Sequence, residues 1–239
     1  MKLVAGSAEL GGSSMFLSSE RLAEYATVMP RLSRRALASG VGALSVLHAL
    51  RARAANDAIG TFPLSLAFAS VDGQRVQDSA WQQAELAEAE RLYAPLGVHF
   101  RVVSERTITT PRAHLETRAD RDALAVDCAP KAINVFVVAS LRDVDDGVSV
   151  RRGVHWRSSQ HPSQRYVILS AIAGPSVLAH ELGHYFGNGH SAVTDNVMSY
   201  ERTGAEVFLD ARQAATIRSA ARLVLTSGEV TLAPSAAHD

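Results

Sequence analysis

The chain has 239 residues, which allows one large domain or two small ones, and 47% of them are hydrophobic, as in a globular protein with a substantial core. The 24 basic and 24 acidic residues give a formal net charge of zero, so the basic field typical of nucleic-acid binding is absent and no nucleic-acid partner is expected. A single cysteine, Cys128, excludes an internal disulfide framework and any metal site built from several cysteines.

The region before residue 55 has the layout of an export signal. From Met29, a basic stretch with the pair Arg34-Arg35 precedes an apolar run over residues 36–50 and an Ala-x-Ala cleavage pattern ending at Ala54. The run is too short to span a membrane, and the paired arginines resemble a bacterial twin-arginine signal. We therefore interpret this region as an N-terminal extension plus signal, with translation starting at Met29, and expect a secreted or periplasmic protein without membrane association after cleavage. The alternative is an amphipathic or membrane-anchoring helix that is never cleaved.

Residues 55–239 are predicted to form one domain, because their length suits a single core and no repeat or linker interrupts them. Alternating and continuous apolar runs indicate strands, and apolar residues at helical spacing indicate helices. In chain order we expect a strand over residues 61–71, a helix over 79–97, strands over 98–103 and 133–141, an edge strand over 148–157, a strand over 165–173, a helix over 175–187 and a last helix that begins near Asp210 with a capping box to Gln213.

The stretch HELGHYFGNGH, residues 180–190, concentrates histidines beside one glutamate. In a helix, His180 and His184 lie one turn apart on the same face, with Cβ atoms about 5 to 6 Å from each other. Two imidazoles at that distance can reach one zinc ion through bonds of about 2.0 to 2.1 Å. Glu181 lies beside such an ion without having to bind it, so it is placed to take a proton from an activated water molecule.

The glycine at position 187 follows His184 by three residues and can adopt the left-handed conformation that ends a helix. The turn would bring His190 back to the same ion as a third ligand. Three neutral imidazoles leave one coordination position open, which is the arrangement of a catalytic zinc site. The alternative that the motif alone leaves open is a histidine-rich helix end without a metal.

The motif is longer than a chance HExxH match, because the whole HExxHxxGxxH is present and DNVMSY follows at residues 195–200. These residues resemble the metzincin clan of zinc endopeptidases, whose signature joins the extended zinc motif to a downstream methionine turn. The Met-x-Tyr sequence is similar to the astacin, serralysin and pappalysin branches. The resemblance implies zinc ligation by His180, His184 and His190, general-base catalysis by Glu181, an apolar floor at Met198 and stabilisation of the reaction's oxyanion by Tyr200.

The resemblance also implies an α+β fold with a mixed, mostly parallel sheet, an active-site helix and a small C-terminal helical subdomain. Members of the clan bind an extended peptide along the edge strand of the sheet, which is a form of strand addition. The candidate edge in this chain gives substrate contacts at Val150, Gly153, Val154 and Trp156.

Other reactive residues have simpler interpretations. We interpret Cys128 as a small hydrophobic residue near the strand over 133–141, with an inhibitory thiolate on the metal as the alternative. His99 and His155 alternate along strands and are expected to face solvent or the cleft. Asn188 departs from the apolar residue that many members of the clan carry after the glycine, which weakens the expected packing there.

The edge strand also carries charge. Arg151, Arg152 and Arg157 are expected either to bind acidic side chains of a substrate or to protect the edge against aggregation. Tyr185 and Phe186 are interpreted as packing residues of the motif helix.

The sequence therefore predicts a secreted, monomeric zinc endopeptidase with one catalytic ion, acting on peptides or proteins with Glu181 as general base. The alternatives are a zinc-stabilised binding module on the same scaffold and a zinc amidase that acts on cell-wall cross-links. Calcium binding stays open, because residues 142–147 are acidic but lack a compact Asp-x-Asp-x-Asp loop.

Overall fold

The computed structural model describes residues 58–108 and 110–234. Internal contacts divide the chain into residues 1–50 and 51–239, and the described residues belong to the second unit. The predicted export signal and its cleavage point lie outside the described residues. No helix in the described part is both long and apolar enough to cross a bilayer.

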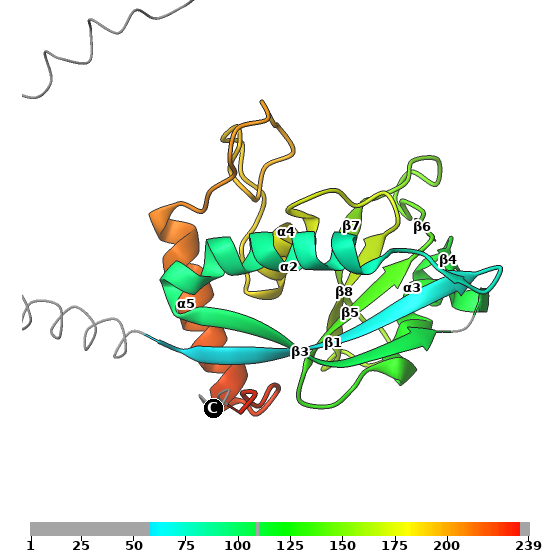
Figure 1. Ribbon diagram of the computed structural model, residues 1–239, viewed down its shortest axis with the longest axis horizontal. Helices are drawn as coiled ribbons and strands as arrows, with labels where there is room; N and C mark the ends of the chain where they lie inside the picture. The colour runs from blue at the N-terminus through cyan, green and yellow to red at the C-terminus, as the bar shows by residue number, and fades with distance from the viewer. Residues whose placement is uncertain (1–57, 109, 235–239) are drawn as a thin grey trace, which may run out of the picture. The chain divides into compact units, whose positions relative to one another are not determined.

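The centre of the described unit is a mixed sheet (Figure 1). Its path runs β2-β1-β5-β8-β7, and β3 pairs with β1. The pairs β1/β3, β1/β5 and β5/β8 are parallel, whereas β7 pairs with β8 and β2 pairs with β1 in antiparallel fashion. The strands are β1 (Gly60–Val71), β2 (Gln74–Arg75), β3 (Val98–Ile108), β5 (Ile133–Val138), β7 (Gly153–Arg157) and β8 (Arg165–Ser170), with β4 (His114–Leu115) and β6 (Ser140–Leu141) forming a separate parallel pair. The predicted α+β class with a mixed, mostly parallel sheet is confirmed.

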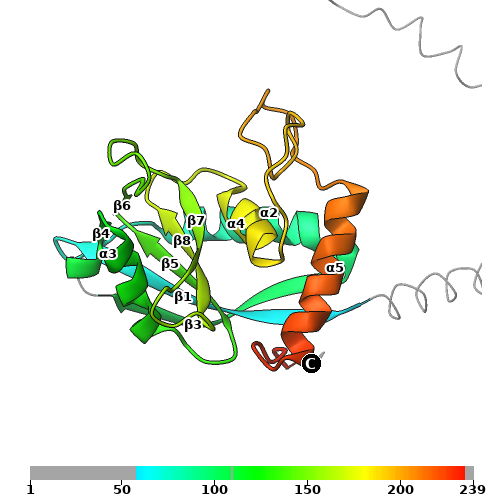
Figure 2. The same ribbon diagram turned by 180° about the vertical axis from the view of Figure 1, so that it is seen from behind.

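Helices cover both faces and both ends of this sheet. They are α2 (Ser79–Tyr93), α3 (Arg118–Ala123), α4 (Val177–Tyr185) and α5 (Ala211–Thr226). In both views α3 and α5 lie at opposite ends of the sheet, and α5 is the predicted C-terminal helix (Figures 1 and 2). The predicted capping box is present, because the Asp210 side chain accepts from Gln213 N while the Gln213 side chain accepts from Asp210 N.

Two apolar clusters hold the layers together, one on each face of the sheet. Strand β5 contributes alternately to both, with Val135 and Val137 in the cluster that contains α2, α4 and α5, and Phe136 and Val138 in the cluster on the opposite face. This two-sided burial is the reason that the β5 sequence is a continuous apolar run.

Several predicted boundaries are wrong. The helix from residue 79 ends at Tyr93, because Pro95 lies in a short 3-10 turn and Gly97 adopts a φ of 74°. The strand from Val98 extends to Ile108 because it stays paired with β1 beyond a register shift. The predicted strands over 133–141 and 165–173 end at Val138 and Ser170.

The edge strand is also shorter than predicted, since it begins at Gly153 rather than at residue 148. The Asp146 side chain accepts from the backbone N–H groups of Val148 and Ser149, so these donors are used inside a local loop. Val150 forms only an isolated bridge with Arg142. The predicted substrate contact at Val150 therefore lies in this loop and not in the edge strand.

Candidate active site

Helix α4 carries the first two histidines of the motif. It begins after Ser176, which has a φ of 76° and provides no side-chain cap, and it is two residues shorter at each end than predicted. Because His180 and His184 lie one helical turn apart, His180 Nε2 is 3.1 Å from His184 Nε2. Both nitrogens face the same side of the helix, as the sequence predicts.

The third histidine reaches the same point through a turn at Gly187, whose φ is 89°. The turn is fixed by hydrogen bonds from Gly187 N to His184 O and from Asn188 N to Gly183 O. His190 Nε2 lies 3.1 Å from His184 Nε2. One ligand nitrogen from each of the three histidines thus lies within 4.8 Å of the other two.

The outer nitrogens of the two helical histidines identify their tautomers. His180 Nδ1 lies 2.7 Å from Val197 O and His184 Nδ1 lies 2.8 Å from Asn188 O. A carbonyl only accepts, so each Nδ1 carries the proton and each Nε2 presents a lone pair. Two lone pairs at 3.1 Å repel each other unless a cation lies between them. The donor set therefore fits one zinc ion.

The electrostatics of the triad favour neutral imidazoles, which are the form that binds a metal. Burial lowers the pKa of His180 to about 4. Burial also lowers the pKa values of His184 and His190. Each of the three imidazoles therefore favours its neutral form more than an unperturbed histidine does, which favours binding of a metal ion.

The side chain of Glu181 extends from α4 toward the edge strand β7, and only 5% of the residue is exposed. Burial raises its pKa to about 8, although a hydrogen bond from the backbone of His155 and the nearby Arg151 act in the opposite direction. Strand β7 approaches closely because Gly153 has no side chain, and a Cβ there would lie 2.8 Å from Glu181 Oε1 and 2.7 Å from Val177 Cγ1. Gly153 thus allows the edge strand to lie against the carboxylate.

The predicted methionine turn lies directly against the motif helix. Met198 is fully buried, and a Cβ on Gly183 would overlap with its sulfur, so the helix needs glycine at this position. The turn is held by Asn196, whose side-chain amide exchanges two hydrogen bonds of 2.9 Å with that of Gln213 on α5. Sequence reasoning identified Gln213 only as a capping residue and did not identify Asn196 as its partner. A buried pair of amides has no local sequence signal.

Tyr200 is exposed, with 69% of its surface accessible. Its hydroxyl lies 2.7 Å from His190 Nε2, so the phenol already reaches the ligand nitrogens. Arg151 lies next to this phenol and interacts with it electrostatically, while its guanidinium forms an ion pair of 2.7 Å with Asp143. The sequence placed Arg151 on a strand surface and did not connect it with Tyr200.

The other residues predicted as substrate contacts lie on both faces of β7. Gly153 lies against Glu181, as described above, but the side chains of Val154 and Trp156 pack into the cluster on the opposite face. These two residues can therefore reach a peptide at the edge only through their backbone. The ring of His155 does not face solvent, because it packs edge-on against Tyr185 with ring centroids 5.8 Å apart, and burial lowers its pKa to about 4.

The remaining residues considered in the sequence analysis have packing roles in the structure. Tyr185 and Phe186 are buried in the core, and Cys128 packs against the apolar cluster on the face opposite α4, where burial raises its pKa to about 11. This position disfavours the alternative of a thiolate on the metal. Asn188 is buried despite its polarity, because its side chain donates to Gln213 O at 3.4 Å.

Comparison with known proteins gives structural relatives only. No protein-family model and no curated protein matches the sequence. Mature mirolysin from Tannerella forsythia, solved with a cleaved peptide, is similar in fold with a TM-score of 0.50 at 10% identity, over 72% of this chain and 98% of that chain.

Two further structures match more weakly. Archaemetzincin from Methanopyrus kandleri has a TM-score of 0.47 at 15% identity, over 69% of this chain and 97% of that chain. Metalloproteinase-II from Bacteroides fragilis has a TM-score of 0.46 at 13% identity, over 67% of this chain, and this chain spans 53% of its length. The likeness concerns the fold alone, and at that level it confirms the resemblance to metzincin-type metalloproteases.

Proposed function

We propose that this chain, which has the fold of the metzincin-type metalloproteases, is a zinc-dependent endopeptidase. The observation that carries the proposal is the convergence of three neutral imidazole nitrogens beside a buried carboxylate and an exposed phenol. Structural histidine clusters have no need for the last two groups. We also propose a peptide or protein as the substrate and, on the basis of the export signal predicted before residue 55, a location outside the cytoplasm.

His180, His184 and His190 would hold one zinc ion through their Nε2 atoms. When bound, zinc supplies the Lewis acid that polarises the scissile carbonyl and activates the attacking water. The backbone carbonyls of Val197 and Asn188 keep two of the imidazoles in the required tautomer and orientation.

Glu181 would accept the proton of the attacking water and deliver it to the nitrogen of the leaving amine. Without a metal, burial raises the pKa of Glu181 to about 8, whereas a cation bound nearby would lower this pKa and so favour the ionised carboxylate that can accept a proton. Tyr200 would donate a hydrogen bond to the oxyanion of the tetrahedral intermediate, because its hydroxyl is exposed and lies next to His190 Nε2.

The edge strand supplies the surface on which an extended peptide would bind. Among residues 58–108 and 110–234, strand β7 pairs only with β8, so its other side is available for strand addition beside Glu181. The exposed Arg152 and Arg157 lie on or beside this edge, and Arg151 is engaged with Asp143. Mirolysin was solved in complex with a cleaved peptide, and we propose that this chain also binds a peptide, at the β7 edge.

The test uses the Glu181→Gln variant of the zinc-loaded protein with a casein substrate and a peptide library. The variant should keep its fold and stoichiometric zinc but lose peptide cleavage by a factor of about 10² or more, because it lacks the general base. Turnover that persists in this variant at matched zinc content would remove Glu181 from its role. Peptidoglycan release without peptide cleavage would favour the amidase, and zinc binding without either activity would favour the binding module.

A further inference from the structure

Helix α2 presents a row of polar side chains to the segment that leads into the zinc-motif helix. Gln77, Trp81, Glu85 and Tyr93, here called the polar stripe, are separated by four, four and eight residues. The last three lie in α2, where this spacing keeps them on one face, and Gln77 directly precedes its N-cap, Asp78.

Each member of the stripe bonds to the backbone of residues 171–179. Gln77 Nε2 donates to Ala171 O at 2.6 Å, and Trp81 Nε1 donates to Ala173 O at 2.9 Å. Further along, Glu85 Oε2 accepts from Leu178 N at 2.8 Å, and Tyr93 Oη donates to Ala179 O at 2.9 Å. The partners follow one another in the same order as the stripe and end immediately before His180.

The contact at Glu85 replaces a cap that α4 lacks. Ser176 has a left-handed backbone and makes no side-chain hydrogen bond to the first turn, whose N–H groups have no partners within the helix. Glu85 comes from a different helix and supplies an acceptor to Leu178 N, two residues before His180. A carboxylate at this position also interacts favourably with the positive end of the helix dipole.

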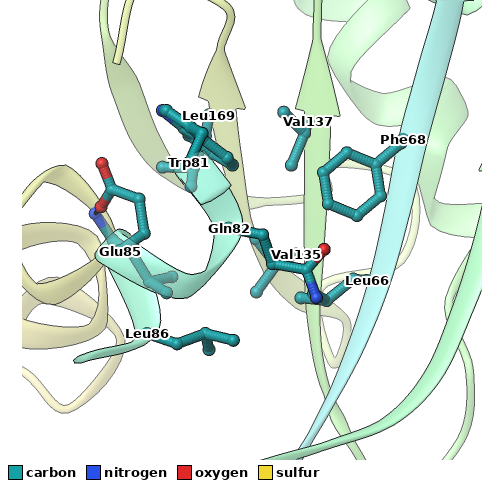
Figure 3. A pocket seen from close by; sticks show the side chains of 10 residues that line it. Leu66, Phe68, Trp81, Gln82, Glu85, Leu86, Val135, Val137 and Leu169 are labelled. Carbon is teal, nitrogen blue, oxygen red and sulfur yellow. Dashed lines mark hydrogen bonds between the residues drawn. The ribbon is translucent and has the colours of Figure 1, made fainter. Parts of the chain in front are cut away.

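The surroundings of Glu85 exclude a ligand site. Only 2% of Glu85 is exposed, and its second oxygen, Oε1, has no hydrogen-bond partner. It borders a cavity with about 10 Å³ of space for the centre of a water molecule, which is enough for one water at most (Figure 3). The side chains contributed by β1, β5, β8 and α4 to this cavity are all apolar: Leu66, Phe68, Val135, Val137, Leu169 and Leu178.

We propose that the polar stripe positions the catalytic helix, with Glu85 as the principal positioning residue for His180 and Glu181. The stripe fixes the backbone on the N-terminal side of both residues, whereas Val197 O holds the His180 ring through its Nδ1. The catalytic part of this inference rests on the proposed function. The effect on zinc binding and on the order of residues 174–183 does not.

The experiment compares Glu85→Ala, Glu85→Gln and Tyr93→Phe, with Glu88→Gln as the matched control. Glu88 lies on the same helix but pairs with Arg91 near the surface. Zinc affinity by chelator competition, hydrogen exchange of residues 174–183, and kcat and KM for a library peptide are measured for each protein. Glu85→Ala should bind zinc about tenfold more weakly and lower kcat about tenfold, with KM changed less than about twofold.

Glu85→Gln keeps an acceptor for Leu178 N, so it should restore zinc affinity and kcat to within about threefold of the wild type. Hydrogen exchange of residues 174–183 should be faster than in the wild type in Glu85→Ala and Tyr93→Phe but no faster than in the wild type in Glu85→Gln and Glu88→Gln. Should Glu85→Ala fail to fold, Tyr93→Phe removes a single hydroxyl and carries the test.

Wild-type zinc affinity and exchange rates in both Glu85→Ala and Tyr93→Phe would overturn the positioning role. The same defects in Glu85→Gln as in Glu85→Ala would show that the charge, and not the hydrogen bond to α4, is what matters. A wild-type protein that binds zinc but cleaves no peptide would refute the proposed function, while zinc affinity and hydrogen exchange would still decide the role of the stripe.

Discussion

Replacing Glu85 by glutamine should stabilise the protein at alkaline pH and leave its stability nearly unchanged at acidic pH. Burial, reinforced by the neighbouring Glu88, raises the pKa of Glu85 from 4.5 to about 7, against the opposing hydrogen bond from Leu178 N. The folded protein therefore binds this proton more tightly than the unfolded chain does. The difference between the two pKa values, about 2.5, corresponds to about 3 kcal/mol.

The sign of the effect follows from which state holds the proton. Below pH 4.5 the carboxyl group is protonated in both the folded and the unfolded state and does not destabilise the fold. Between pH 4.5 and about pH 7 the free energy of unfolding of the wild type falls progressively by about 3 kcal/mol. Glutamine is neutral throughout and keeps the acceptor for Leu178 N. The free energy of unfolding of Glu85→Gln should thus exceed that of the wild type by up to about 3 kcal/mol at about pH 8.

Urea denaturation of the metal-free protein at a series of pH values measures this difference, and the absence of metal removes the contribution of zinc binding to the histidines. Glu88→Gln serves as the control, because Glu88 pairs with Arg91 and makes a smaller contribution than burial to the raised pKa of Glu85, so this variant should show a much smaller gain. Parallel stability curves for the wild type and Glu85→Gln between about pH 4 and pH 8 would refute the reasoning, since they would show that Glu85 does not change its proton affinity on folding.

Three further predictions concern the site itself. Tyr200→Phe should lower kcat by about 10² to 10³ with little loss of stability, measured by peptide kinetics and thermal unfolding, because its exposed hydroxyl would stabilise the oxyanion in the proposed reaction. Gly183→Ala should cost about 1 to 3 kcal/mol in urea unfolding, because its Cβ overlaps with Met198, whereas Gly189→Ala meets no atom within 4 Å and should be neutral. Zinc at about a thousand times its Kd should stabilise the wild type by about 4 kcal/mol, and His190→Ala should lose most of this gain in a thermal-shift titration.

The sequence predicted those parts of the site that depend on local geometry. His180 and His184 share a helix face because of the helical repeat, and Gly187 can adopt the positive φ that returns His190. The order of strands and helices along the chain is also largely predictable, because apolar runs indicate strands and apolar residues at helical spacing indicate helices. These features follow from residues that are close together in the chain.

The edge strand shows where such reasoning fails. Residues 148–152 have strand-forming composition, but the Asp146 side chain binds the N–H groups of Val148 and Ser149, and this loop competes with pairing to β8. The two faces of β7 could not be assigned either, because Val154 and Trp156 face a cluster formed by distant strands. Alternation predicts that neighbours face opposite sides, but it does not say which side faces the catalytic groups.

The groups that orient the two helical histidines are backbone carbonyls, which explains why a polar residue is tolerated within the motif. His184 Nδ1 binds the carbonyl of Asn188, and any residue at this position would offer the same acceptor. The side chain of Asn188 is not needed for this contact, and it donates a hydrogen bond to Gln213 O instead. By contrast, Asn196 and Gln213 bind through their side chains, so replacement of either one leaves a buried amide without its partner. The tolerance of this site to substitution therefore depends on whether a residue contributes its backbone or its side chain, a distinction that only the folded structure reveals.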